Sequence, residues 1–231
     1  MNQLMTAQTA QLSAPPRPGI PGTPPPGRRR ADQIQGGHHG FTRDQVETSQ
    51  RGRIVGAMIR LVGTRPFAEV GVADLVATAG VSRKTFYQQF SNKEEVFAEA
   101  YDQALSGLIG VMAQAAESSQ GRRDRLAVRV TALLTVLARE NPIGRVCFVE
   151  VAAAGPLALE RRRQGTAAIA AALLGFDEGG EVPITALAAA GGLSEVIHHE
   201  IVAGRGDRLV SLAPELVETV MSPIWSEAGW Q

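Results

Sequence analysis

The chain has 231 residues, of which 44% are hydrophobic, 5% are aromatic and one is a cysteine. The hydrophobic share suffices for a folded core and excludes a largely disordered or fibrous protein, and a lone cysteine excludes a disulfide framework. No run approaches the roughly 18–20 apolar residues that cross a bilayer, and the first residues lack the basic and apolar regions of a secretion signal. We therefore expect a cytoplasmic protein with no membrane partner.

The net charge of zero combines two unlike parts of the chain. Residues 1–95 contain 12 Lys or Arg against 7 Asp or Glu, a net of +5, whereas residues 96–231 contain 11 against 16, a net of −5. This asymmetry indicates a basic part that faces nucleic acid, joined to a part with another task. The alternative is an ordinary drift of charge along the chain.

Residues 1–40 form the first predicted segment, a tail rich in Pro and Arg. They hold 7 of the 13 prolines and show no apolar periodicity, which is typical of an extended or disordered tail. The run Arg28–Arg30 could follow a phosphate backbone. A solvated linker, or a start codon assigned too far upstream, explains the same composition.

Helical periodicity begins near Thr48. Apolar residues at spacings of three and four predict a helix of about fifteen residues that ends near Thr64, where Pro66 then prevents its continuation. A second helix is predicted over residues 72–79, with Gly80 directly after it in a position that suits a left-handed backbone.

Two capping signals follow this second helix. Ser82 is expected to cap a third helix that runs to about Phe90. The segment Ser91-Asn92-Lys93-Glu94 matches a capping box, with Ser91 as the cap, and opens a long fourth helix.

The second and third helices, joined by a tight turn, make a helix-turn-helix. Phe86 and Phe90 lie four residues apart and are expected to point inward. The outer face then carries polar residues that suit base edges and phosphates, with arginine matched to guanine and glutamine to adenine: Arg83, Lys84, Thr85, Tyr87 and Gln88. Lys93 adds a cation beside helix amides that already favour a phosphate.

The stretch from Arg51 to Glu95 resembles the N-terminal domain of TetR-type transcriptional regulators. The most specific part is A-G-V-S-x-x-T-F-Y-x-x-F-x-x-K-E, from Ala79 to Glu94. The resemblance implies an all-helical homodimer that binds a palindromic operator through its N-terminal domains and a small ligand through its C-terminal domain. It also implies DNA contacts from the residues that match the family motif: Ser82, Thr85, Tyr87 and Lys93.

Three positions depart from the family pattern. Gly71 stands where a threonine often caps the second helix and contacts a phosphate, and Pro66 stands where glycine is frequent. Gln89 stands where histidine or tyrosine is common.

The expected fold is all-α, with a helix-turn-helix domain at residues 41–95 and a helical ligand-binding and dimerisation domain at 96–231.

Five further helices are predicted in the C-terminal part, the first carrying an apolar stripe from Leu126 to Leu137 and the others lying at about 143–153, 157–174, 183–203 and 212–225. The last two have broad apolar faces that suit a four-helix dimer bundle, or else a core within one chain.

A ligand pocket is expected between these helices and the fourth one. Its candidate lining residues, each of which could equally be ordinary core, are Leu133, Leu137, Cys147, Phe148, Glu150, Leu173 and Phe176. No metal or other cofactor is expected, because the adjacent His198 and His199 point about 100° apart on a helix and no second ligand pair follows.

The sequence thus favours a non-enzymatic, ligand-responsive DNA-binding regulator, most simply a dimeric repressor that binds a double-stranded operator and a small effector. No phosphate loop, metal cluster or nucleophile elbow supports an enzyme. Two alternatives stay open. One is a DNA-binding protein that responds to no ligand, and the other is a helical small-molecule-binding protein or enzyme with no DNA function.

Overall fold

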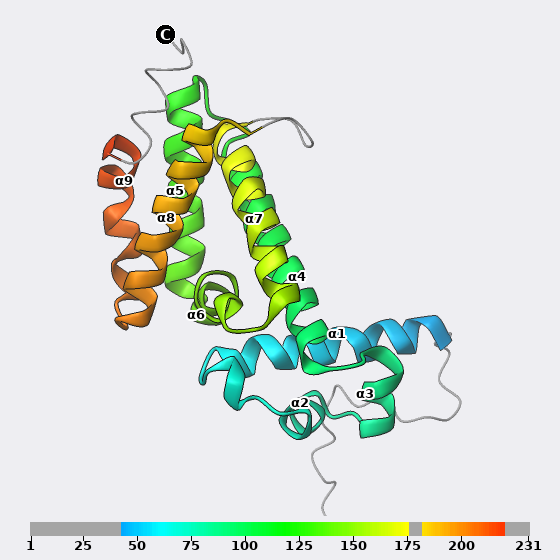
Figure 1. Cartoon of the computed structure of the whole chain (residues 1–231). Coiled ribbons are helices and arrows are strands. Elements are labelled where there is room, and N and C mark those ends of the chain that lie inside the picture. Colours follow the sequence, from blue (N-terminus) through cyan, green and yellow to red (C-terminus); the bar gives the residue numbers. More distant parts are fainter. Residues whose placement is uncertain (1–42, 176–181, 220–231) are drawn as a thin grey trace, which may run out of the picture. The chain divides into compact units, whose positions relative to one another are not determined.

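The computed structural model describes residues 43–175 and 182–219, which lie within one compact unit, His38–Gln231. The predicted tail at residues 1–40 lies outside this part of the chain. All regular elements among the described residues are helical, so the predicted all-α class is confirmed (Figure 1).

The N-terminal part contains the predicted helix-turn-helix. Its elements are α1 (Arg43–Val62), the 3₁₀ helix η1 (Phe67–Glu69), α2 (Val72–Ala79), α3 (Arg83–Gln89) and α4 (Lys93–Ala115). Helix α1 begins earlier than predicted and ends at Val62, where a turn with Thr64 N–H bonded to Leu61 O leads into Pro66. Helix α2 has the predicted bounds, and Gly80 after it adopts φ 65°, a left-handed conformation that favours glycine.

The start of α4 corrects the predicted capping box. The cap is Asn92 rather than Ser91, because the Asn92 side chain accepts a hydrogen bond from Glu95 N–H at 2.8 Å. Glu95 reaches back one residue further and accepts from Ser91 N–H at 2.8 Å. The two accepting side chains, Asn92 and Glu95, are therefore each one residue later than predicted, while the Ser91 amide is a donor in both arrangements.

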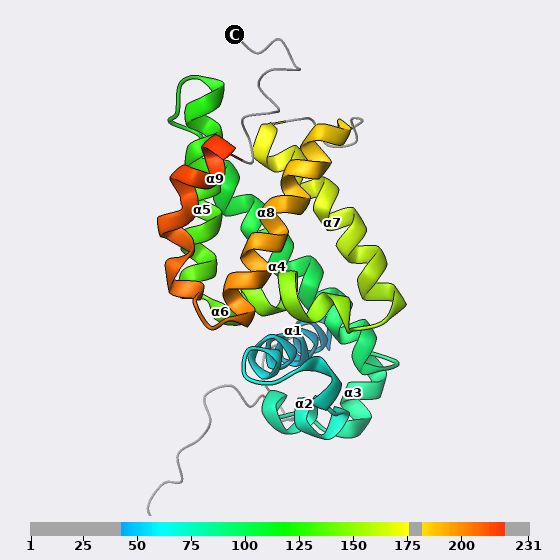
Figure 2. The same ribbon diagram turned by 60° about the vertical axis from the view of Figure 1, so that its left-hand side comes forward.

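The C-terminal part consists of further helices, some packed directly against α4 and the others packed against those helices (Figure 2). It begins with α5 (Arg122–Arg139), whose predicted apolar stripe is fully buried at its five positions: Leu126, Val130, Leu133, Leu134 and Leu137. It continues with α7 (Pro156–Leu174), α8 (Ile184–Val202), the 3₁₀ helix η4 (Gly206–Leu212) and α9 (Ala213–Thr219). The predicted last helix therefore starts near its expected position, and its predicted end near residue 225 lies outside the described residues.

The helix predicted at about 143–153 is present at residues 141–152, but it is not a regular α-helix. The α-helical geometry breaks after α6 (Asn141–Gly144) and gives way to a π-helical turn η2 (Arg145–Val149) and the 3₁₀ helix η3 (Glu150–Ala152). Contacts from two sides accompany the break: Arg145 and Glu150 bond the α1–η1 region, and the Phe148 carbonyl lies 2.8 Å from Nδ1 of His198. A π-turn inside a helix is commonly found at a functional site.

The buried apolar side chains among the described residues form one contiguous core, from Ile54 in α1 to Val217 in α9. Helix α4 runs through the predicted domain boundary at residue 95 and packs against α1, α5 and α7 (Figure 2). Within the described residues no single helix is long and apolar enough to cross a membrane, although the pair 141–152 and 156–174, bent by 117°, meets the length and composition criteria together.

Candidate nucleic-acid interface

Helix α3 is set against the core by its two phenylalanines. Phe86 is fully buried and Phe90 is 3% exposed, whereas Tyr87, between them in the sequence, is 61% exposed. The ring centroids of Phe86 and Phe90 lie 6.2 Å apart. The predicted inward anchors are thus confirmed, and burial of one face of this short helix forces the other face outward.

The outward face of α3 carries the residues expected to contact DNA. Ser82, Arg83, Lys84, Tyr87 and Gln88 are exposed, and Thr85 is half-buried. Within 43–175 and 182–219, the side chains of Arg83, Lys84 and Gln88 form no hydrogen bond or ion pair. Their donors are therefore available to an external partner such as a base edge or a phosphate.

The N-terminus of α3 is held by two hydroxyl groups. The Ser82 hydroxyl accepts a hydrogen bond from Thr85 N–H at 3.0 Å, which confirms Ser82 as the cap, and it lies 2.9 Å from the Thr85 hydroxyl. This arrangement fixes the first turn of α3, where a recognition helix meets base edges.

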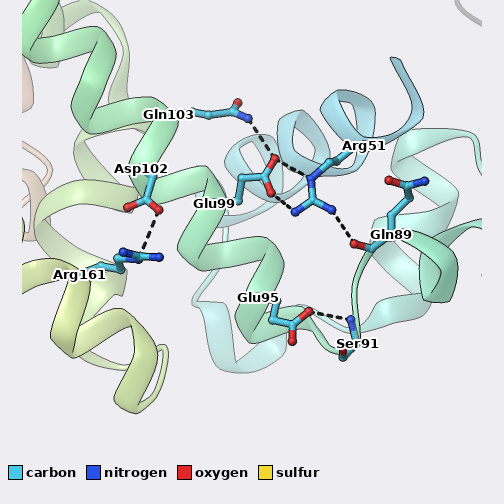
Figure 3. A network of polar contacts seen from close by, with 8 residues as sticks. All are labelled: Arg51, Gln89, Ser91, Glu95, Glu99, Asp102, Gln103 and Arg161. Carbon is cyan, nitrogen blue, oxygen red and sulfur yellow. Dashed lines mark hydrogen bonds and ion pairs between the residues drawn. The ribbon is translucent and has the colours of Figure 1, made fainter. Parts of the chain in front are cut away.

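The C-terminus of α3 is held by Arg51 of α1, a residue that the sequence did not single out (Figure 3). Its Nη1 donates to the Gln89 carbonyl at 2.6 Å, and its other nitrogens bind both carboxylate oxygens of Glu99 in α4. The guanidinium also lies 4.1 Å from the centre of the Phe90 ring. Arg51 therefore joins three helices, and a cation at a helix C-terminus is favourable. In this chain Gln89 contributes through its backbone.

Lys93, predicted to contact a phosphate, makes contacts within the chain. Its ammonium donates to the carbonyls of Phe67 at 3.1 Å, Ala68 at 3.4 Å and Val70 at 2.9 Å, and it lies 4.4 Å from the centre of the Phe67 ring. An ammonium has three donors, and three carbonyl oxygens lie within reach of them. The geometry gives Lys93 a positioning role at the end of η1, and its phosphate contact stays a prediction.

Replacing Lys93 by Ala should lower the free energy of unfolding by about 1.5–3 kcal/mol, because three carbonyls lose a charged donor. The matched control is Lys84→Ala, since Lys84 is the other lysine of the chain and is exposed and unpaired among the described residues. Lys84→Ala should leave stability within about 0.5 kcal/mol. Urea unfolding followed by circular dichroism measures both, and equal stability of the two variants would contradict the positioning role.

The turn before α2 shows how the chain does without the threonine that is common in the family. The Asp74 carboxylate accepts from Gly71 N–H at 2.9 Å and pairs with Arg65 at 2.9 Å. The bond from the Gly71 amide lowers the pKa of Asp74 below its ordinary value, and the smaller effect of Arg65 acts in the same direction. Asp74 thus supplies one bond of a capping box, the one to the Gly71 amide, while Gly71 has no side chain to accept from the first turn of α2.

The predicted ligand-lining residues separate into four groups. Leu133, Leu137, Cys147 and Phe148 are buried in the core, and Phe176 lies outside the described residues. Burial raises the pKa of Cys147 to about 12, so the thiolate that oxidation requires is disfavoured. Leu173 lies in the wall of a surface cleft, and Glu150 binds elements of the N-terminal part.

Glu150 and Arg145 connect the π-turn to the N-terminal part. The buried Glu150 carboxylate accepts from Phe67 N–H at 2.8 Å and pairs with Arg145, whose Nε donates to the Val62 carbonyl at 2.7 Å. The two residues therefore contact both sides of the α1–η1 turn. Sequence reasoning missed this link, because its partners lie 83 positions apart.

No group of three His, Cys, Asp or Glu in the described ranges is placed to hold a metal ion. The half-buried His198 instead contacts the Phe148 carbonyl through Nδ1.

Comparison with known proteins agrees with this geometry. The family model for bacterial regulatory proteins of the tetR family matches residues 54–100. The chain is 29% identical over 172 residues to the HTH-type transcriptional regulator EthR of Mycolicibacterium smegmatis, covering 72% of this chain and 79% of that protein. It is 25% identical over 99 residues to the HTH-type transcriptional activator FasR of the same organism, covering 43% and 45%.

Two solved structures share the fold. The transcriptional regulator FadR from Bacillus subtilis, in complex with stearoyl-CoA, matches with a TM-score of 0.62 and 19% identity over 74% of this chain and 97% of that chain. The fatty acid degradation regulator FadR from Bacillus halodurans matches with a TM-score of 0.62 and 15% identity over 74% and 94%. The matched residues 54–100 contain the helix-turn-helix described above, so the N-terminal part of the chain is similar to the tetR family of bacterial regulatory proteins.

Proposed function

We propose that the protein is a cytoplasmic transcriptional regulator that places α3 in the major groove of an operator. The observation that supports this most directly is the division of α3 into two faces. Phe86 and Phe90 are buried, while Arg83, Lys84 and Gln88 are exposed and have no partner among the described residues. Arg51 and the Ser82 cap hold the helix at both ends, which is the preorganisation that base recognition requires.

We further propose that the protein acts as a homodimer on a palindromic site. Two recognition helices must lie about 34–36 Å apart to enter successive major grooves. Helix α8 supplies a candidate contact surface, because Ile184 is 82% exposed and Val202 is 58% exposed at its two ends. Repression is the simplest outcome of operator binding, although FasR is named an activator, so a reporter assay has to establish the direction.

The proposed response to a small effector is supported by the link between the two halves. FadR of Bacillus subtilis was solved with stearoyl-CoA, so a protein of this fold can hold a small ligand. In this chain a path of bonds runs from His198 in α8 through the π-turn to Arg145 and Glu150, and from there to α1 and η1. A ligand that shifts α8 or the π-turn would thereby alter the position of the DNA-binding elements. A coupling of about 1–3 kcal/mol would change DNA affinity 5- to 150-fold.

The test begins with sites selected from random DNA by the full chain. Arg83→Ala should relax the preference at one base pair of each half-site and cost about 1–3 kcal/mol there, because a bidentate contact to guanine is lost. Tyr87→Phe should weaken binding to all sequences about equally, as expected for a phosphate contact. Fluorescence anisotropy on matched and mismatched sites measures both effects.

Two results would count against this function. One is the reverse pattern, in which Tyr87→Phe changes sequence preference and Arg83→Ala does not. The other is a binding constant that hardly changes with salt, since each phosphate contact should contribute about −0.9 to the slope of log K against log salt.

A further inference from the structure

A cleft between α5 and α7 has an unusual concentration of positive charge. It has a volume of about 250 Å³ and is lined by three arginines, three apolar residues and a glycine: Arg122, Arg125, Arg129, Leu126, Leu173, Leu174 and Gly175. Among the residues that the structure describes, no carboxylate belongs to this lining. The arginines are spaced by three and four along α5, so they project from one face of the helix.

Two of these arginines have no carboxylate partner in the described part of the chain. Neither Arg125 nor Arg129 forms an ion pair there, whereas Arg123, on the neighbouring face of α5, pairs with Glu218. Like charges at this spacing repel each other, which makes a cluster of arginines unfavourable by itself. Burial lowers the pKa of Arg129, and the nearby charge of Arg125 lowers it further.

The backbone holds both guanidinium groups in place. Arg129 Nη1 donates to the Leu173 carbonyl at 3.1 Å, and Arg125 Nε donates to the Gly121 carbonyl at 3.3 Å. Gly175, at φ 76°, lets the Arg129 guanidinium approach closely, because a Cβ there would lie 3.1 Å from Nη1. The buried Arg129 Nε has no acceptor among the described residues. The guanidinium groups of Arg125 and Arg129 are thus preorganised, and the described residues leave some of their donors unused.

We propose that this cleft binds a diphosphate group. Planar guanidinium groups bind phosphate oxygens in pairs, and neighbouring arginines match a group with several negative charges better than a single carboxylate. The volume is below the roughly 300–1,000 Å³ of pockets for drug-sized ligands, so a compact group fits better than a large molecule. The proposal does not depend on DNA binding, since the site lies on α5 and α7 and is tested without DNA.

The experiment is isothermal titration calorimetry of the full chain with inorganic pyrophosphate, at constant ionic strength set with chloride. We expect saturable binding that Arg125→Gln weakens by about 10- to 100-fold, the effect of losing charge-assisted hydrogen bonds. Arg125 is exposed, so this variant should fold normally. The matched control is Arg123→Gln, which removes the same charge from the same turn of α5 and should bind pyrophosphate as the unmodified chain does.

A second titration with ADP distinguishes the two sources of a diphosphate. Equal affinities would identify the inorganic group as the ligand, and tighter ADP binding would show that an organic ester also contacts the apolar part of the cleft. Either result supports the site. It is overturned if pyrophosphate produces no saturable heat, or if Arg125→Gln and Arg123→Gln weaken binding equally, which would indicate a general charge effect.

Discussion

Replacement of Glu150 by Ala is expected to destabilise the protein by about 3–5 kcal/mol, the cost of breaking a buried ion pair by removing one partner. The side chain of Glu150 is 6% exposed and that of Arg145 is 21% exposed, so water cannot solvate the remaining guanidinium well. The Phe67 N–H would also lose its acceptor. Thermal unfolding should show the effect clearly, because each kcal/mol corresponds to roughly 2–4 °C in a domain of this size.

Two further variants distinguish the buried ion pair from an ordinary surface ion pair. Glu160→Ala is the matched control, because Glu160 pairs with Arg163 on an exposed helix face, where an ion pair contributes little to stability. The double variant Arg145→Met/Glu150→Leu removes both charges and should recover part of the lost stability, although Phe67 N–H stays without an acceptor. A thermal midpoint of Glu150→Ala equal to that of Glu160→Ala would contradict the proposed buried link.

Replacement of Phe86 by Ala should cost about 3–5 kcal/mol, the usual effect of removing a fully buried phenylalanine. Phe86 fixes α3 to the core of the N-terminal part and contacts Phe90 and Tyr87. Its loss leaves a cavity under the recognition helix. Chemical unfolding measures the loss of stability, and Phe86→Leu should retain much of it because that substitution removes less volume.

The adjacent Tyr87 provides the matched control on the same helix. Tyr87 is 61% exposed and contacts the Phe86 ring by its edge, so Tyr87→Ala should cost no more than about 1.5 kcal/mol of stability while it weakens binding to DNA. The two variants should therefore separate: Phe86→Ala loses stability, and Tyr87→Ala loses affinity in a folded protein. If Tyr87→Ala proved as destabilising as Phe86→Ala, the division of α3 into a buried and a DNA-facing side would be wrong.

The helix-turn-helix could be predicted closely because its signals are local. Gly80 ends α2 through a left-handed backbone, and Ser82 caps α3 through a bond to Thr85 only three residues away. The spacing of Phe86 and Phe90 then determines which side of α3 is buried. Even here the cap of α4 differs from the prediction and is Asn92 in place of Ser91. Both residue types are good caps, and only the backbone geometry distinguishes them.

The sequence by itself determined the all-helical class, the bounds of α2 and α3, and the outward face that carries Arg83, Lys84 and Gln88. Only the tertiary structure decided which polar groups far apart in the sequence come into contact. Arg51 binds Glu99 across 48 positions, and Glu150 binds Phe67 N–H across 83. Periodicity reports on neighbours one helical turn apart, whereas these contacts depend on how whole helices pack. For the same reason, the arginines of α5 form a cleft only because α7 ends at Gly175 beside them.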